Sequence, residues 1–231
     1  MTGPSVTGLT FGELDRDGAL SEALDRVAGD SRADFLRKTL VGSAALLAAL
    51  SLPEPGGAAS KNDIDILNYA LTLEYLQAAF YTETERAGAV RGKAKQAARR
   101  VGAVERAHVR AFRKALGSAA VKRPSFDFRG VTESQTPFLK TAVAFEDLAV
   151  AAYKGQAPLI QDKSVLGVAV SIHSVEARHA AWMRYLFGIV PAARAFDLPA
   201  PKAKVLRTVA SAGFITSKPK TAGKEKPQFT G

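Results

Sequence analysis

The sequence predicts an all-α protein built around a four-helix bundle, in which two antiparallel hairpins are joined by one long crossover and a short C-terminal helix follows. Apolar residues recur at three- and four-residue spacing through residues 62–190, where strand-like alternation is absent. Residues suited to helix ends divide this stretch into four long segments. The links between the segments are short, long and short, which is the order that two hairpins and one crossover require.

Residues typical of helix ends mark the four predicted helices. We expect these helices over residues 62–87, 91–116, 137–154 and 162–187. Asn62, Thr136 and Asp162 suit N-caps, and Pro137 suits a first helical turn. Glycines suited to C-terminal stops stand at Gly88, Gly117, Gly155 and Gly188.

The long middle link, residues 117–136, decides how the two hairpins are connected. Extended at about 3.3 Å per residue, its 20 residues reach roughly 65 Å. A helix of about 25 residues is only about 38 Å long. The link can therefore run the length of the bundle and start the third helix beside the second.

Two further segments follow the bundle, which we place at residues 60–190. Residues 191–216 are expected to form a C-terminal extension, with a short helix around residues 202–212 that packs outside the bundle. Residues 217–231 contain four lysines and two glycines, so we expect a disordered basic tail.

Residues 1–59 have the layout of an export signal. A polar, acidic stretch precedes the segment Ser31-Arg32-Ala33-Asp34-Phe35-Leu36-Arg37-Lys38, and an apolar run over residues 39–52 and small residues at 57–59 follow it. The apolar run is too short to cross a hydrocarbon core of about 30 Å comfortably. The segment is similar to a twin-arginine (Tat) signal, with Ala33 at the second arginine position. It predicts export to the periplasm, cell envelope or medium. The alternative for the segment is an apolar helix packed on the domain or lying on a membrane, and the alternative location is the cytoplasm.

Composition excludes several classes of protein and site. Hydrophobic residues make up 47% of the chain and charged residues 23%, which excludes a collagen, a wholly disordered chain and a multi-span membrane protein. The chain contains no cysteine, so disulfides, thiolate zinc sites, iron–sulfur clusters and cysteine nucleophiles are excluded. Any bound metal ion must therefore be held by oxygen and imidazole nitrogen.

Each predicted bundle helix carries one glutamate in the middle of its apolar stripe. On the second and fourth helices a histidine follows at i+3, one turn later on the same face. In chain order these residues are Glu74, Glu105, His108, Glu146, Glu176 and His179. We expect all six side chains to point into the core of the bundle.

Four buried carboxylates need cations, because an ionised group in an apolar interior is strongly destabilising unless it is paired. No lysine or arginine lies on the inner faces of the predicted helices. Two divalent cations would bring the charge of the four carboxylates to zero. Oxygen and imidazole ligands suit iron or manganese, and zinc less specifically. We therefore predict two iron or manganese ions per chain.

The two hairpins also repeat each other in sequence. Glu74-x-Leu76-x-x-Ala79-x-Tyr81 matches Glu146-x-Leu148-x-x-Ala151-x-Tyr153. Val104-Glu105-x-x-His108 matches Val175-Glu176-x-x-His179. A duplicated hairpin predicts a pseudo-twofold site with one half from each copy.

With these residues in place, residues 62–190 resemble the ferritin-like di-iron carboxylate bundles, and in detail the exported ferritin-like proteins grouped with desiccation-related proteins. The carrying segments are Leu67-Asn68-Tyr69-Ala70-Leu71-Thr72-Leu73-Glu74-Tyr75-Leu76, Phe145-Glu146-Asp147 through Ala151-Ala152-Tyr153, and Ser171-Ile172-His173-Ser174-Val175-Glu176-Ala177-Arg178-His179-Ala180-Ala181-Trp182. The resemblance implies a dinuclear centre. Glu74 and His108 are then ligands on one half with Glu105 bridging, and Glu146 and His179 on the other with Glu176 bridging.

Three function classes are compatible with this pattern. Two adjacent redox metal ions can pass two electrons to dioxygen or peroxide, which favours oxidation of Fe(II) or removal of peroxide in stress protection. A second class is a non-catalytic, desiccation-protective protein in which metal only stabilises the bundle. A third is a basic DNA-protecting mini-ferritin analogue, which an exported protein argues against. The sequence assigns no catalytic residue and leaves the oligomeric state open.

The formal net charge of +10 raises the question of an anionic partner. Nine arginines and lysines lie between Arg91 and Lys114, all away from Glu105. A solvated face is the simplest interpretation, and DNA, a cell-envelope polymer or lipid headgroups are the alternative partners. We expect no specific nucleic-acid binding, because no stacking aromatics are interleaved with the basic residues.

Three further residues have both a structural and a functional interpretation. Tyr81 and Tyr153 lie two turns from the lone glutamates. We expect them to pack in the core, with hydrogen bonding to the ligands or a radical role as the alternative. His173 lies one turn before Glu176 and is expected to be a boundary residue between core and surface, with a hydrogen bond to a ligand carboxylate as its alternative.

Overall fold

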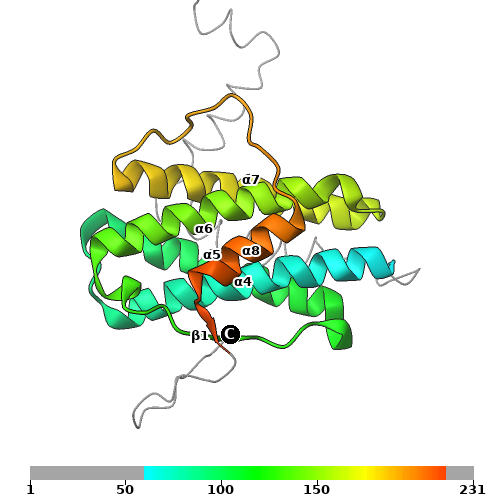
Figure 1. Ribbon diagram of the computed structural model, residues 1–231, viewed down its shortest axis with the longest axis horizontal. Coiled ribbons are helices and arrows are strands. Elements are labelled where there is room, and N and C mark those ends of the chain that lie inside the picture. Colours follow the sequence, from blue (N-terminus) through cyan, green and yellow to red (C-terminus); the bar gives the residue numbers. More distant parts are fainter. Residues whose placement is uncertain (1–59, 217–231) are drawn as a thin grey trace, which may run out of the picture. The chain divides into compact units, whose positions relative to one another are not determined.

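A computed structural model describes residues 60–216 of the chain (Figure 1). Its five α-helices are α4 (Lys61–Ala87), α5 (Gly92–Leu116), α6 (Gln135–Gln156), α7 (Lys163–Phe187) and α8 (Lys202–Ala212). Three short 3₁₀ helices are η1 (Gly117–Ala119), η2 (Val131–Glu133) and η3 (Ala157–Leu159). The two strands are β1 (Ser125–Phe126) and β2 (Ile215–Thr216).

The four long helices form the predicted bundle. α4 pairs with α5 and α6 pairs with α7, while α4 also contacts α6 and α5 contacts α7. The segment between α5 and α6 runs along the bundle as the single crossover (Figure 1). The predicted all-α architecture of two hairpins joined by one crossover is therefore confirmed. The apolar stripes of the four helices meet in one core, as their 3.6-residue period requires.

The helix starts differ from the prediction at two of three caps. Asp162 caps α7 as predicted, because its side chain accepts hydrogen bonds from the backbone N–H groups of Ser164 and Val165. Ser60, not Asn62, caps α4, and its hydroxyl accepts from the N–H of Asp63 at 3.1 Å. Thr136 lies inside the first turn of α6, which begins one residue earlier at Gln135. A serine two positions upstream of Asn62 caps α4 instead. The choice between two capping residues this close together depends on local geometry.

Gly155 does not stop the third bundle helix, which continues to Gln156. The glycine is needed there because the C-terminal extension passes against it. A Cβ atom at this position would lie 2.1 Å from the carbonyl oxygen of Ala200. The N–H of Ala200 donates to the carbonyl oxygen of Ala151 at 2.9 Å, which fixes the extension on α6. Close backbone approach, and not helix termination, explains this glycine.

The C-terminal extension packs on the outside of the bundle, as expected. α8 contacts α6 (Figure 1), and the ammonium of Lys202 lies 5.3 Å from the ring centroid of Tyr69 on α4. β2 then pairs antiparallel with β1 of the crossover, with Phe126 opposite Ile215. This two-residue pairing was not predicted, since neither segment alternates for long enough to be recognised as a strand.

An aromatic cluster holds the crossover and the extension against the bundle. The ring of Phe80 lies 5.5, 5.4 and 5.0 Å from the rings of Phe128, Phe138 and Phe145, respectively. Phe214 joins the cluster 5.6 Å from Phe128. Phe80 is fully buried, so one side chain of α4 connects the crossover to α6.

Asp63 ties the start of α4 to the turn before α7. Its carboxylate is buried and accepts hydrogen bonds from the backbone N–H groups of Gln161 at 3.0 Å and Asp162 at 2.9 Å. These bonds join residues almost 100 positions apart, which no local pattern reveals.

We expect Asp63→Ala to lower the free energy of unfolding by about 2 kcal/mol, because two backbone donors lose their acceptor. Urea unfolding followed by circular dichroism measures this change. Asp65→Ala is the matched control, since Asp65 is an exposed aspartate in the same helical turn. An equal effect of both substitutions would contradict the role of Asp63.

Among residues 60–216, no helix is both long and apolar enough to cross a membrane. The predicted export signal and the predicted basic tail fall on residues 1–59 and 217–231, which lie outside the described part of the chain.

Candidate metal centre

The structure brings the six predicted ligand residues together at the middle of the bundle. One glutamate comes from each long helix, and the two histidines come from α5 and α7. The four carboxylates are completely buried, and His108 and His179 are 9% and 7% exposed. The inward-pointing glutamates that interrupt the four apolar stripes thus form a single closed cluster.

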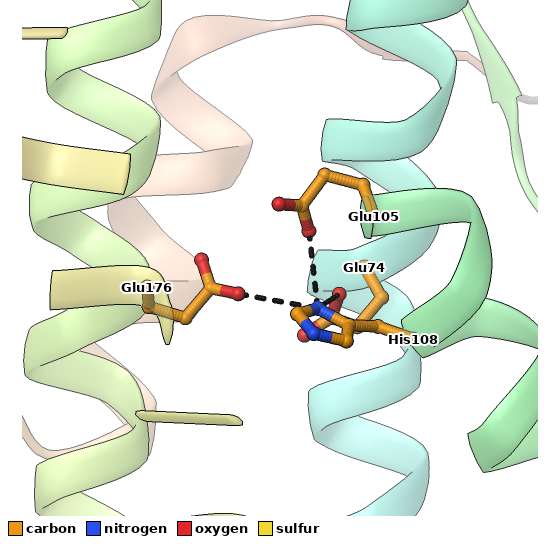
Figure 2. Close-up of side chains that lie close together, drawn as sticks. All are labelled: Glu74, Glu105, His108 and Glu176. Carbon is orange, nitrogen blue, oxygen red and sulfur yellow. Dashed lines mark hydrogen bonds and ion pairs between the residues drawn. The ribbon is translucent and has the colours of Figure 1, made fainter. Parts of the chain in front are cut away.

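His108 faces three carboxylates. Its Nδ1 lies 3.2 Å from Glu74, 3.5 Å from Glu105 and 3.3 Å from Glu176. Figure 2 shows these three carboxylates converging on the imidazole ring. The i+3 spacing of Glu105 and His108 places both on the same face of α5, and α4 and α7 supply the other two groups.

His179 occupies the corresponding place in the other half. Its Nδ1 lies 2.9 Å from Glu105 Oε1 and 3.6 Å from Glu146 Oε2. Two four-residue groups could therefore each hold an ion, with their ligand atoms within 4.8 Å of one another. They are Glu74, Glu105, His108 and Glu176, and Glu105, Glu146, Glu176 and His179. Glu105 and Glu176 belong to both groups, as bridging ligands would.

Two tyrosines hold the remaining glutamates by hydrogen bonds across the hairpins. The hydroxyl of Tyr153 on α6 donates to Glu74 Oε1, and the hydroxyl of Tyr81 on α4 donates to Glu146 Oε1. Both tyrosines are buried, as expected, but they also fix the orientation of the candidate ligands. Core packing alone is therefore too narrow an interpretation. Their matched positions in the repeat were the signal for this role.

Gln77 is a site residue that sequence reasoning missed. It is 2% exposed, and its Nε2 lies 3.1 Å from Glu146 Oε2 and 3.3 Å from Glu176 Oε2. The available signal was a glutamine one turn after Glu74 on an otherwise apolar face. His173, by contrast, lies at the boundary as expected, where burial and Lys154 lower its pKa against the opposing effect of Asp197.

The carboxyl groups of Glu74, Glu105 and Glu176 differ in pKa. Burial raises the pKa of Glu74 to about 7 and that of Glu176 well above its usual range, and the neighbouring carboxylates add to both shifts. Burial also opposes ionisation of Glu105, but close contacts with His108 and His179 outweigh it and hold the pKa of Glu105 below its usual range.

Both histidines favour the protonated state. Burial disfavours their charge, yet the surrounding carboxylates raise the pKa of His179 to about 10 and the pKa of His108 well above its usual value. Without metal, the cluster therefore approaches neutrality by retaining protons on both imidazoles and on part of the carboxylates.

Within the described part of the chain, four buried atoms in the middle of the cluster make no hydrogen bond of good geometry, although each lies within 3.5 Å of an oppositely charged group. They are both carboxylate oxygens of Glu105, Oε1 of Glu176 and Nδ1 of His179. A buried polar group without a partner is destabilising by about 1–3 kcal/mol, and more when it is charged. Carboxylate oxygens and imidazole nitrogens that converge at one point without well-formed hydrogen bonds fit a divalent cation with mixed oxygen and nitrogen coordination.

The nine basic residues from Arg91 to Lys114 point away from this cluster. Eight of the nine are exposed, and Arg106 is partly buried in an ion pair with Glu85 at 3.0 Å. This placement is that of a solvated face, and an anionic partner for it stays a prediction.

The fold and the buried cluster together define the class of protein. A family model described as a ferritin-like domain matches residues 62–188, more than half of the chain. The chain therefore belongs to the ferritin-like family, and the predicted ferritin-like bundle is confirmed. Among curated proteins, no sequence matches the chain significantly.

Proposed function

We propose that the protein binds two iron or manganese ions in the bundle core and uses them to oxidise Fe(II) or remove peroxide. The observation that carries the proposal is Glu105, whose two fully buried oxygens face the Nδ1 atoms of His179 and His108 at 2.9 and 3.5 Å, without a hydrogen bond of good geometry. Glu74, Glu105, His108 and Glu176 hold one ion, and Glu105, Glu146, Glu176 and His179 hold the other. Two redox-active ions supply two electrons, the number that reduces dioxygen to hydrogen peroxide or hydrogen peroxide to water.

The residues around the centre have separate tasks in this proposal. Tyr81 and Tyr153 orient the terminal glutamates, because each hydroxyl donates to one oxygen of the carboxylate. His108 and His179 release their protons and present a nitrogen lone pair. The surrounding apolar side chains exclude bulk water from the carboxylates.

Elemental analysis of the purified full-length chain tests the metal centre. We expect close to two iron or manganese ions per chain, and their loss in the Glu105→Ala/His108→Ala variant. A folded, stable protein that takes up no metal after iron loading would contradict the proposal. Stopped-flow measurement of Fe(II) loss under oxygen or peroxide then tests the reaction.

The near-complete burial of the ligands favours a second candidate function, in which metal only stabilises the bundle. A metal-loaded protein with a raised melting temperature would then oxidise no Fe(II) at any iron load. The same stopped-flow experiment separates the two candidates.

Metal uptake is expected to release about three or more protons per chain at pH 7. Both imidazoles and Glu176 have a raised pKa and are protonated in the metal-free cluster, and Glu74, with a pKa of about 7, carries a proton in about half of the molecules. Protons compete with the ions, so affinity should fall as the pH is lowered and rise toward pH 10. A pH indicator in weakly buffered solution measures the release. Uptake without proton release would contradict this charge distribution.

We also propose that the protein acts outside the cytoplasm, on the basis of the signal-like segment at residues 31–59. Fractionation of cells expressing the full chain tests this location, with Arg32→Lys as the control variant that should retain the protein in the cytoplasm.

A further inference from the structure

A small cavity lies in the bundle core beside the cluster of carboxylates and histidines. Its volume is about 20 Å³, and all four long helices contribute side chains to its wall. Leu73, which precedes Glu74 in the chain, and Tyr153, whose hydroxyl donates to Glu74, both line it. The cavity therefore adjoins the Glu74 side of the candidate metal centre.

The sequence repeat explains why the core is incompletely filled at this place. Three residues of the cavity wall correspond to phenylalanines in the other hairpin, at the same sequence separation that pairs Tyr81 with Tyr153. Ile66, Leu73 and Ala152 line the cavity, and their counterparts are Phe138, Phe145 and Phe80, respectively. Those three rings contact one another in the aromatic cluster. Where the other half of the bundle packs three aromatic rings, this half has smaller side chains and a cavity.

The wall of the cavity is almost entirely apolar. Its polar groups belong to Tyr69, Tyr153 and Gln156, and the hydroxyl of Tyr153 is already bonded to Glu74. The hydroxyl of Tyr69 is buried and has no hydrogen-bond partner among the described residues. A buried water makes about three hydrogen bonds, whereas apolar cavities stay dry and bind gases such as xenon. With only Tyr69 and Gln156 to bond a water, the cavity favours a small apolar molecule.

We propose that this cavity holds dioxygen beside the metal centre, and that dioxygen, not hydrogen peroxide, is the oxidant. Dioxygen is small and apolar and needs no hydrogen bond. Hydrogen peroxide would lose its hydrogen bonds to water, and the wall offers too few partners to replace them. Ile160 and Val168 are only partly buried, so one wall lies near the surface from which dissolved gas can enter. This inference rests on the oxidation of Fe(II) proposed above.

Krypton tests the cavity in the absence of metal. Crystals of the metal-free full-length protein are pressurised with krypton, and anomalous scattering shows where the gas binds. We expect one krypton atom between Leu73, Ala152 and Ala169, which line the cavity from three helices. An ordered water bonded to Tyr69, with no krypton at this position, would overturn the inference.

Two substitutions fill the cavity without replacing a candidate ligand. Ile66→Phe introduces the residue of the other hairpin, and Ala169→Val adds two methyl groups on α7. Ala98→Val is the matched control, because Ala98 is the counterpart of Ala169 on α5 and is also buried, but does not line the cavity. We expect both filling variants to lose the krypton and the control to keep it.

Stopped-flow measurement on the iron-loaded proteins tests the oxidant. Loss of Fe(II) is followed at several dioxygen concentrations and, without dioxygen, at several peroxide concentrations. The filling variants should bind as much metal as the wild type but need about fivefold more dioxygen, or higher still, for half-maximal rate, because filling the cavity weakens binding of the oxidant. Their rates with peroxide, and both rates of Ala98→Val, should match the wild type.

The outcomes separate this inference from the function on which it rests. If the filling variants react with dioxygen as the wild type does, or lose dioxygen and peroxide reactivity equally, the inference is wrong while the metal centre stands. A wild-type protein that reacts only with peroxide would also overturn the inference alone. If the wild type binds no metal, or oxidises no Fe(II) with either oxidant, the proposed function is wrong and the inference falls with it.

Discussion

Removal of bound metal is expected to lower the melting temperature of the protein by about 10–20 °C. Each ion stabilises the folded chain by about 2.7 kcal/mol when its free concentration is 100 times its dissociation constant. For a chain of this size, each kcal/mol corresponds to about 2–4 °C. The physical reason is the set of buried carboxylates. In the metal-free protein, retained protons and the two protonated histidines compensate the charge of these carboxylates. Scanning calorimetry with and without a chelator measures the change.

Glu105→Gln is the control for this experiment. The amide matches the carboxylate in size but removes the charge that contacts both histidines. We expect the variant to stay folded and to lose most of the metal-dependent rise in melting temperature. If the melting temperature of the wild-type protein changes with neither chelator nor added iron, the result would count against metal binding in either proposed function.

Phe80→Ala is expected to destabilise the protein by about 3–5 kcal/mol, through lost burial and the cavity left behind. Phe80 is fully buried, and its ring contacts those of Phe128 in the crossover and of Phe138 and Phe145 on α6. The melting temperature should fall by about 10 °C. Chemical denaturation of the metal-free protein measures the loss without interference from ion binding.

Phe196→Ala provides the comparison, because Phe196 is 79% exposed. Its removal should change the free energy of unfolding by less than about 0.5 kcal/mol. Similar losses for Phe80 and Phe196 would show that the aromatic cluster does not hold the crossover on the bundle. Retained metal binding in a folded Phe80→Ala protein would place the damage in the core and not in the centre.

The helices and the six clustered residues could be predicted because their signals are local. An apolar period of three to four residues places Glu105 and His108 on one inner face of their helix, independently of the tertiary structure. The repeat adds the corresponding Glu176 and His179. Two glycines with left-handed backbone, Gly88 and Gly188, end α4 and α7 as predicted.

Other features could not be predicted because they depend on residues far apart in the chain. Gly155 has the sequence context of a helix stop, but its role comes from the backbone of Ala200 passing over it. In the sequence, nothing distinguishes Asp63 from the neighbouring acidic residues. Its role comes from the turn before α7, whose backbone N–H groups lie within hydrogen-bond distance of its carboxylate. The pairing of β1 with β2 requires two segments that are about 90 residues apart.

By itself, the sequence determined the all-α class, the single crossover and the set of glutamates and histidines that faces the core, since periodicity and spacing depend on neighbours in the chain. Only the tertiary structure decided how these groups are partnered. It placed Tyr81 on Glu146, Tyr153 on Glu74 and Gln77 on one half of the centre. Hydrogen bonds and pKa values depend on distances of a few ångströms between helices, and those distances exist only once the bundle is packed.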